Sequence, residues 1–290
     1  MICSKIIRKI KKLLGIKPQM LFIDTSSRVE VSPSASIKNS RIELKGKSRL
    51  KIGDGVVIDG TYIVLEDSEL IILSNVQISN VNLFAKSNSC INLSDSVQID
   101  RYDWMLWQSV VTIDKNCVFN QGRNALRPYF NLSEGQLHIL DHNVIRADFW
   151  IRFGGVVNVG QYNCINERTE LRCDEQIRIG DFNMISYDCN IWDTNTHCIY
   201  SPSVRREKTI SDFPVIGSES ERPKTKPVII GNDCWVGKGS VILKGSVLEN
   251  EAIVATRAIV SNQTVGKHQI AKSAKAEIIS VIKVSNQEAK

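Results

Sequence analysis

His197 is the residue of this sequence whose surroundings best suit chemistry. It lies in the stretch IWDTNTHCIY, where Asp193 precedes it by four residues. An imidazole with an ordinary pKa of about 6.5 can accept a proton at neutral pH, and a nearby carboxylate can orient the ring. These two residues predict a general base, His197, with Asp193 as its orienting partner. A polar histidine at a corner of the fold, with no chemistry, is the alternative.

The chain around His197 follows a long repeat that must position it. One segment recurs in eight versions: LKIGDGVVI, LIILSNVQI, INLSDSVQI, VTIDKNCVF, LHILDHNVI, VNVGQYNCI, IRIGDFNMI and VIIGNDCWV. The third, aliphatic position of these segments recurs after 20, 21, 20, 26, 20, 20 and 51 residues. A period near 20 indicates a solenoid in which each coil packs on the next.

The last third of the chain resolves this repeat into units of six residues. Aliphatic residues stand at Ile230, Val236, Ile242, Leu248, Val254 and Val260, and each is followed four residues later by Cys, Ser, Ala or Thr. Three such units make a three-sided coil with small residues at its corners. We therefore predict an all-β fold, a left-handed parallel β-helix of about ten coils. A β-sandwich is the alternative, but it requires turn signals every 8–12 residues or so.

Two long steps in the repeat predict departures from the coils. The step of 26 places an insertion at 121–135, and the step of 51 places a protruding loop at 198–227. The β-helix is expected over 27–272, and 273–290 is expected to form a C-terminal cap with a short helix. A loop of this length in a compact repeat is usually functional or disordered.

The N-terminal segment 1–17 holds six basic side chains and no acidic one. Its isoleucines and leucines fall on one helical face and its cations on the other, which predicts a basic amphipathic helix. Such a helix either lies on an anionic membrane surface or packs on protein. The rest of the chain has 31 basic and 31 acidic residues, which argues against a nucleic-acid surface. No run of 18 apolar residues predicts a transmembrane helix.

The cysteines and histidines do not predict a metal centre. The eight cysteines form no CxxC pair, so reduced thiols are expected and a zinc site is not. The four histidines are scattered along the chain rather than set on adjacent coils. We therefore expect no metal ligands.

Two stretches carry a family resemblance. IGDFNMISYDCNIWDTNTH resembles the segment that leads to the catalytic histidine of the hexapeptide-repeat acyltransferases, and VIIGNDCWVGKGSVILKGSVLENEAIVATRAIVS resembles their cofactor-binding coils. Within that family the chain is similar to sugar and polysaccharide O-acetyltransferases of the maltose/galactoside type. The resemblance is specific over 156–261 and only architectural over 27–153.

The resemblance implies an acetyl-CoA-dependent O-acetyltransferase. Its acceptor would be a sugar hydroxyl of a surface polysaccharide, such as a capsule or O-antigen, or of its lipid-linked precursor. His197 matches the base that deprotonates this hydroxyl for direct attack on the thioester. The resemblance also implies a homotrimer with active sites between subunits, in the cytoplasm and, through 1–17, at the inner face of a bacterial membrane.

The resemblance further implies residues that bind the two substrates. Asn166 and Asn195 match positions that contact the acceptor, although Asn195 replaces an aspartate of the family. The acetyl-CoA positions are Trp235, Gly237, Lys238 (through its peptide N–H), Thr256, Arg257 and Ser261. Asn262 stands where many relatives have a lysine near the nucleotide phosphates.

Two other functions stay open at this point. An N-acetyltransferase of an amino sugar needs the same base, so the motif serves both reactions. A non-catalytic β-helix scaffold is the other alternative, but a scaffold has no reason to interrupt its coils beside a histidine.

Overall fold

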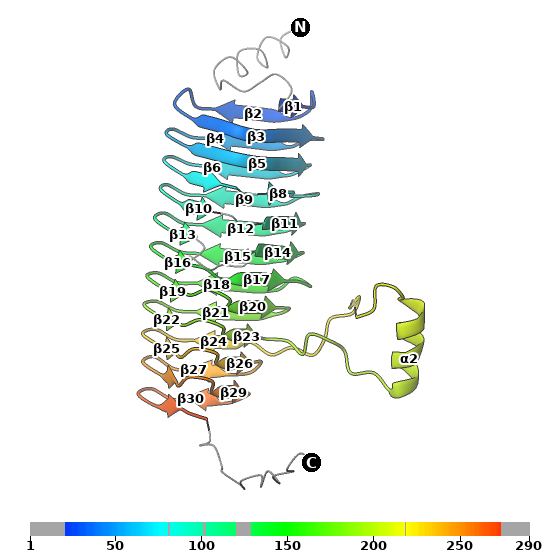
Figure 1. Ribbon diagram of the computed structural model, residues 1–290, viewed down its shortest axis with the longest axis vertical. Coiled ribbons are helices and arrows are strands. Elements are labelled where there is room, and N and C mark those ends of the chain that lie inside the picture. Colours follow the sequence, from blue (N-terminus) through cyan, green and yellow to red (C-terminus); the bar gives the residue numbers. More distant parts are fainter. Residues whose placement is uncertain (1–20, 81, 101–102, 120–128, 218, 274–290) are drawn as a thin grey trace, which may run out of the picture.

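The computed structural model describes residues 21–80, 82–100, 103–119, 129–217 and 219–273. The predicted helix at 1–17, most of the insertion at 121–135 and nearly all of the cap at 273–290 lie outside the described residues. The described chain is one stack of coils with a single arm (Figure 1). Among the described helices, none is long and apolar enough to cross a membrane.

Each coil has three faces, and the first face is a parallel sheet of 11 strands. Its members are β2 (Arg28–Val31), β4 (Arg49–Ile52), β6 (Glu69–Ile72), β9 (Cys90–Leu93), β12 (Val110–Ile113), β15 (Gln136–Ile139), β18 (Val156–Val159), β21 (Gln176–Ile179), β24 (Val228–Ile230), β27 (Val247–Leu248) and β30 (Thr264–Val265).

The second face follows the first along every coil. Its strands are β7 (Gln77–Ser79), β10 (Gln98–Asp100), β13 (Val118–Phe119), β16 (Val144–Ile145), β19 (Cys164–Ile165), β22 (Met184–Ile185), β25 (Trp235–Val236), β28 (Ile253–Val254) and β31 (Ile270–Ala271). The long strands β3 (Ser36–Lys45) and β5 (Val57–Glu66) bend from the second face onto the third, which joins these two faces into one 20-stranded sheet.

The third face completes each coil. Its strands are β1 (Leu21–Ile23), β8 (Asn82–Leu83), β11 (Asp103–Trp107), β14 (Tyr129–Ser133), β17 (Asp148–Ile151), β20 (Glu170–Cys173), β23 (Asn190–Trp192), β26 (Val241–Leu243) and β29 (Ile259–Ser261). In Figure 1 the nearer strands of the third face run to the right, the fainter first-face strands run to the left, and the coils descend. This winding is left-handed, so the predicted left-handed parallel β-helix is confirmed, with eleven first-face strands against about ten predicted coils.

The register of the coils confirms the predicted repeat. Along the first face Ile52 pairs with Ile72, and the same column continues to Ile230 in the predicted steps, with Ile113 paired to Ile139 and Ile179 to Ile230. Side chains alternate between half-buried and buried along these strands, because every second residue points into the prism. The core is therefore a continuous stack of aliphatic layers.

Small polar residues satisfy the backbone at the corners. At the corner between the first and second faces, Asn143 and Asn163 each accept a hydrogen bond from the amide one coil on, at 2.8 and 2.9 Å. Asn183 accepts in the same way from the Cys234 amide at 2.7 Å. Such ladders matter because a buried backbone amide without a partner is costly. The strict spacing of six ends at Val260. The next inward residue would be at position 266 by that spacing, but Leu248 pairs with Val265, one residue earlier.

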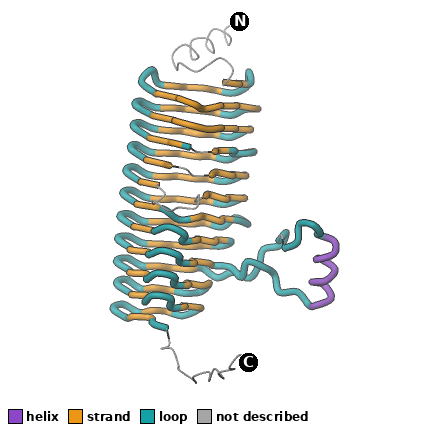
Figure 2. The backbone as a smooth tube through the Cα atoms, viewed as in Figure 1, coloured by secondary structure: helices purple, strands orange, loops and turns teal. Residues whose placement is uncertain are grey.

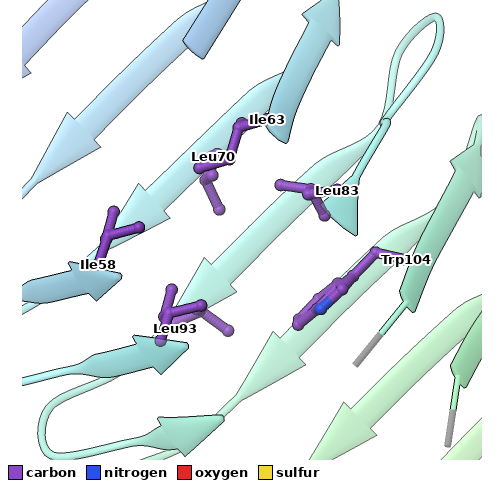
Figure 3. A pocket seen from close by; sticks show the side chains of 7 residues that line it. Ile58, Ile63, Leu70, Leu83, Leu93 and Trp104 are labelled. Atoms are coloured by element: carbon purple, nitrogen blue, oxygen red, sulfur yellow. The ribbon is translucent and has the colours of Figure 1, made fainter. Parts of the chain in front are cut away.

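One internal cavity lies in the N-terminal half of the prism. Its volume is about 20 Å³, and its lining is apolar apart from the indole nitrogen of Trp104 (Figure 3). A space of this size holds about one water molecule, since a water needs roughly 10–15 Å³ of such volume. This cavity is therefore too small for a sugar or a coenzyme.

The arm is the chief departure from the coils. The chain leaves the prism after β23 and returns at β24, and the segment between them carries α2 (Pro202–Ser211), well away from the stack (Figure 2). We call residues 194–227 the arm. It starts a few residues before the predicted 198, because Thr194 already pairs in antiparallel fashion with Thr225.

Candidate active site

The base of the arm is anchored by a buried acidic cluster. Asp174, fully buried, accepts two hydrogen bonds from the Arg152 guanidinium at 3.0 and 2.8 Å and one from the Thr194 hydroxyl at 2.7 Å. Bidentate arginine–carboxylate pairs of this kind fix geometry as well as contribute energy. The first residue of the arm is thereby held on the prism.

Asp193 is part of this anchor, and it does not contact His197. Its carboxylate is fully buried and accepts hydrogen bonds from the backbone amides of Asp174, Glu175 and Gln176, at 2.8, 2.8 and 2.6 Å. Burial raises the pKa of this carboxyl, and the backbone amides oppose that rise. The expectation that Asp193 orients the imidazole is therefore corrected: its oxygens close the corner of the coil instead.

Glu219 is the carboxylate that contacts His197. Nδ1 of His197 lies 2.9 Å from Oε1 of Glu219, whose side chain is only 2% exposed, whereas the histidine side chain is 53% exposed. A proton on Nδ1 satisfies the carboxylate and leaves Nε2 as the nitrogen that can accept another. Burial would raise the pKa of Glu219, but the hydrogen bond and charge of His197 and the charge of Arg205 leave it lowered.

Other residues of the arm hold Glu219 in place. The Tyr200 hydroxyl donates to its Oε2 at 3.5 Å, and Nη1 of Arg205 lies 4.0 Å from its Oε1. Arg205, on α2, also donates to the Cys198 carbonyl at 2.8 Å and stacks on the Tyr200 ring, 5.1 Å from its centroid. The helix begins at Pro202 with Ser201 as its N-cap, which sets where Arg205 can reach.

His197 itself lies outside the prism. The histidine takes no place in the aliphatic layers, because the chain leaves the coil after β23. Val228 and Ile230 supply the aliphatic layer of the next coil after the arm returns. The imidazole borders Gly217, whose φ is +88° and where a Cβ would lie 4.0 Å from Cε1 of His197. The ring thus borders Gly217 and remains partly exposed to solvent.

The residues assigned to acetyl-CoA gather mainly at another corner. Gly237 and Lys238 turn the corner between the second and third faces, and Thr256 and Arg257 turn it one coil further on. The Arg257 amide donates to the Lys238 carbonyl at 2.9 Å. A Cβ at Gly237 would lie 2.5 Å from the Thr256 amide nitrogen, so this close approach of two coils requires glycine. Trp235 precedes the corner on β25 with its indole 57% exposed.

This corner combines an aromatic face with exposed cations. The Lys238 ammonium lies 3.6 Å from Asp188, and hydrogen bonds from Arg168 together with the Lys238 charge hold the pKa of that carboxyl below its usual range. An exposed indole beside a lysine and an arginine suits a ligand with an apolar arm and phosphate groups. Ser261 lies apart from these residues, at the far end of β29.

The two asparagines assigned to the acceptor lie at different places. Asn166 is at the corner between the second and third faces, where its Oδ1 accepts from Arg146 at 2.8 Å and its Nδ2 donates to the Ile185 carbonyl at 3.1 Å. Asn195 lies in the arm, and its amide donates to the Lys224 carbonyl at 3.0 Å. Within one chain, only Asn195 is near His197.

The two halves of the candidate site are therefore apart in a single chain. The width of the third face separates the corner of Gly237, Lys238 and Arg257 from the corner where the arm departs. Glu219, the carboxylate that contacts His197, was not predicted, because it lies in a stretch with no periodicity and 22 residues from His197. A buried glutamate in an otherwise exposed loop is visible only once the loop is folded.

Comparison with known proteins finds resemblance in structure alone. No family model matches the chain, and no curated protein sequence matches it. Among solved structures, the polySia-specific acetyltransferase NeuO is 14% identical, with 90% of this chain and 86% of that chain aligned and a TM-score of 0.39. The polysialic acid O-acetyltransferase OatWY is 16% identical over 93% and 92% of the two chains, with a TM-score of 0.30.

A third solved structure is a hexapeptide-repeat-containing acetyltransferase from Vibrio cholerae O1 biovar eltor in complex with acetyl coenzyme A. It is 22% identical, with 52% of this chain and 72% of that chain aligned and a TM-score of 0.36. The structural neighbours are thus acyltransferases of the type that the sequence resembles. At these identities and scores the likeness by itself establishes no shared substrate or mechanism.

Proposed function

We propose that this chain is an acetyl-CoA-dependent O-acetyltransferase that acts on a sugar hydroxyl, with His197 as general base. The contact between His197 and Glu219 carries the proposal: a buried carboxylate holds Nδ1, and the histidine side chain remains 53% exposed. A catalytic base needs this arrangement, whereas a scaffold does not. A positioned base of this kind contributes roughly 10²–10⁴-fold to a rate.

In the proposed reaction, Nε2 of His197 removes the proton from the acceptor hydroxyl as its oxygen attacks the thioester carbonyl. The new C–O bond forms, the C–S bond breaks, and the proton passes from the imidazolium to the departing CoA thiolate. The peptide N–H of Lys238 is the proposed donor to the carbonyl oxygen as negative charge develops there. Positioning of the two substrates supplies much of the remaining acceleration.

The proposed reaction requires a second copy of the chain. His197 and the acetyl-CoA corner lie on opposite sides of the third face, so an arm must reach a neighbouring prism to bring them together. The arm exposes apolar side chains in keeping with such a contact: Ile199, Ile210, Phe213, Val215 and Ile216 are each more than half exposed. We propose a homotrimer in which each arm covers the acetyl-CoA corner of its neighbour and excludes water.

The setting that we propose is the modification of a capsule, O-antigen or lipid-linked glycan at the inner face of a bacterial membrane. The basic segment 1–17 would supply the contact with anionic lipid. Co-sedimentation with phosphatidylglycerol vesicles tests this part by itself: the full chain should pellet with the vesicles and a chain lacking 1–17 should not. Equal pelleting of both would refute the membrane contact and leave the enzymatic proposal intact.

CoA release tests the enzymatic proposal. Purified protein is given acetyl-CoA and the surface polysaccharide of its source organism, prepared from a strain lacking this gene. We expect the wild-type protein to release CoA thiol and His197→Ala to release none. We also expect mild alkali to remove the acetyl group from the product, since esters are cleaved under conditions that leave amides intact. An alkali-stable product would indicate N-acetylation of an amino sugar instead. No release with the wild-type protein, or equal release by His197→Ala, would refute the proposal.

A further inference from the structure

A second hollow lies on the third face, several coils from the arm. It is formed by β11, β14 and the residues that follow β8, has a volume of about 440 Å³ and opens to solvent. Its lining includes Phe84, Lys86, Met105, Trp107, Asn131 and Ser133. Ligand sites commonly combine an apolar floor with a few polar groups at the edge, and this hollow has both.

Trp107 is the central residue of the hollow. Its side chain is 46% exposed, although it stands on a regular strand. The coil before it places the Lys86 ammonium over one side of the ring, 5.8 Å from the centroid. The coil after it places Ser133 opposite Trp107 in the register, and the short serine side chain leaves the other side of the ring uncovered. The ring therefore presents one open face.

The edge of the hollow provides hydrogen-bonding groups beside the Trp107 ring. Asn131 pairs with Met105 in the register, directly beside Ser133, and Lys86 is exposed above the ring. One side of a pyranose is lined by C–H groups that pack on an indole, and its hydroxyls point outwards from that side. An open indole flanked by an amide, a hydroxyl and an ammonium group suits this ligand better than a wholly apolar one.

We propose that the Trp107 hollow binds a sugar unit of a polymeric acceptor while another unit of the same polymer is at His197. This inference rests on the proposed sugar acetyltransferase function and adds a second place on the third face where the polymeric acceptor is held. Binding at a distant unit raises the local concentration of the acceptor at the base without any new contact there.

The register supplies a path from the hollow to β23, the last strand before the arm that carries His197. One outward column of the third face runs from Met105 through Asn131, Trp150 and Arg172 to Trp192, each paired with the next. The Arg172 guanidinium lies between the two indoles, 5.1 and 5.3 Å from their centroids. Four strand spacings separate β11 from β23, roughly 19 Å at ~4.8 Å each. Several sugar units are needed to cover this distance, so a short acceptor cannot occupy both places.

The test compares acceptors of different length. The source organism's polysaccharide is hydrolysed and separated into fragments of one or two units and fragments of ten or more. With long fragments we expect Trp107→Ala to raise KM about tenfold, a loss of ~1.4 kcal/mol of binding, without a change in kcat. With the shortest fragments the variant should match the wild type. Equal effects at both lengths would overturn the proposal.

Two further variants keep the test informative. Ser133→Phe places a ring against the open face of Trp107 while retaining the indole, and it should raise KM for long fragments as Trp107→Ala does. Leu140→Ala, which removes an exposed apolar side chain elsewhere on the solenoid, is the matched control. It should change KM neither for long fragments nor for the shortest ones. Wild-type behaviour of Ser133→Phe with long fragments would overturn the proposal.

Binding measured without catalysis separates this inference from the proposed function. Fluorescence polarisation of labelled long fragments should weaken about tenfold in Trp107→Ala and stay unchanged in His197→Ala. If the wild type releases no CoA but binds long fragments through Trp107, the proposed acetyltransferase function is refuted and sugar binding in the hollow is supported. If Trp107→Ala instead changes the oligomeric state in sedimentation velocity, the hollow is a contact between copies of the chain and the inference is wrong.

Discussion

The coils and the arm of this protein are held together by different physics. In the coils, a column such as Ile179 and Ile230 is fully enclosed, and each layer packs on the one before it. In the arm, α2 has no buried residue, and the segment is held by hydrogen bonds and ion pairs around Glu219 and Asp174. The coils therefore gain their stability from apolar burial, whereas the arm gains its shape from a few polar contacts.

This difference separates stability from function along one chain. A solenoid tolerates an insertion at a corner because each coil contacts only its neighbours, and β21 pairs with β24 across the whole arm. The arm is then free to carry residues that a packed layer cannot accept, such as an exposed imidazole beside a buried carboxylate. The comparison predicts that changes in the arm alter activity and leave the coils folded.

The largest effect is expected at the base. His197→Ala should lower kcat by roughly 10²–10⁴-fold because it removes the proposed proton acceptor. The melting temperature of the coils should stay within a degree or two of the wild type, since the His197 side chain is 53% exposed and lies in the arm. CoA release and differential scanning calorimetry measure the two quantities. A large fall in melting temperature would show that the arm contributes to the stability of the coils.

The next effect contrasts two isoleucines. Ile242→Ala removes methyl groups from a fully buried layer and should cost about 2–5 kcal/mol of unfolding free energy. Ile210→Ala, at a side chain that is 79% exposed on α2, should change it by no more than about 0.5 kcal/mol. Urea denaturation measures both. Similar losses in the two variants would mean that the arm packs on the coils.

The same difference between the coils and the arm explains which features could be predicted from the sequence. The steps from Ile52 to Ile230 were predicted correctly because each buried face needs an aliphatic residue at a fixed interval, and that need is local. The exception, Val265, follows the shorter step at the end of the stack. The positions of Lys238 and Arg257 at one corner also follow directly from the repeat.

Contacts that depend on the folding of the arm were not predictable. Asp193 was assigned to His197 because it is close in sequence, but Asp193 still belongs to the coil and serves the amides of the corner beside it. Glu219 is distant in sequence and reaches His197 only because Thr194 and Thr225 pair and bring the two sides of the arm together. No period links such residues, so only a structure identifies them.

A smaller effect tests the role of Glu219 as a positioning residue. Glu219→Gln should lower kcat roughly 10- to 100-fold, since a hydrogen bond to a charged group is worth about 1.5–3 kcal/mol. The neutral amide favours the imidazolium less, so the acid limb of the pH–rate profile should move to lower pH. Glu221→Gln, at an exposed glutamate two residues away, is the matched control. A fall in rate without movement of the acid limb would indicate a structural role only.

The smallest effect is a difference in pH response between two carboxylates, that of Glu219 in the arm and that of Asp193 in the coil beside it. The pKa of Glu219 is lowered below its ordinary 4.5, so its ion pair stabilises the arm fully above about that pH and is lost as the pH falls through the lower value. The pKa of Asp193 is raised instead, so its ionised form is the disfavoured one in the folded protein and acid does not weaken this corner. Hydrogen exchange measured from pH 7 downwards in steps, corrected for intrinsic rates, should therefore show protection lost around Tyr200 and Arg205 at some pH below 4.5 and retained at the amides of Asp174 to Gln176. Glu219→Gln should abolish the change in the arm, because the amide does not titrate. Loss of protection at both places at the same pH would mean that acid also loosens the corner at the base of the arm. The corner and the arm would then not differ in their response to pH.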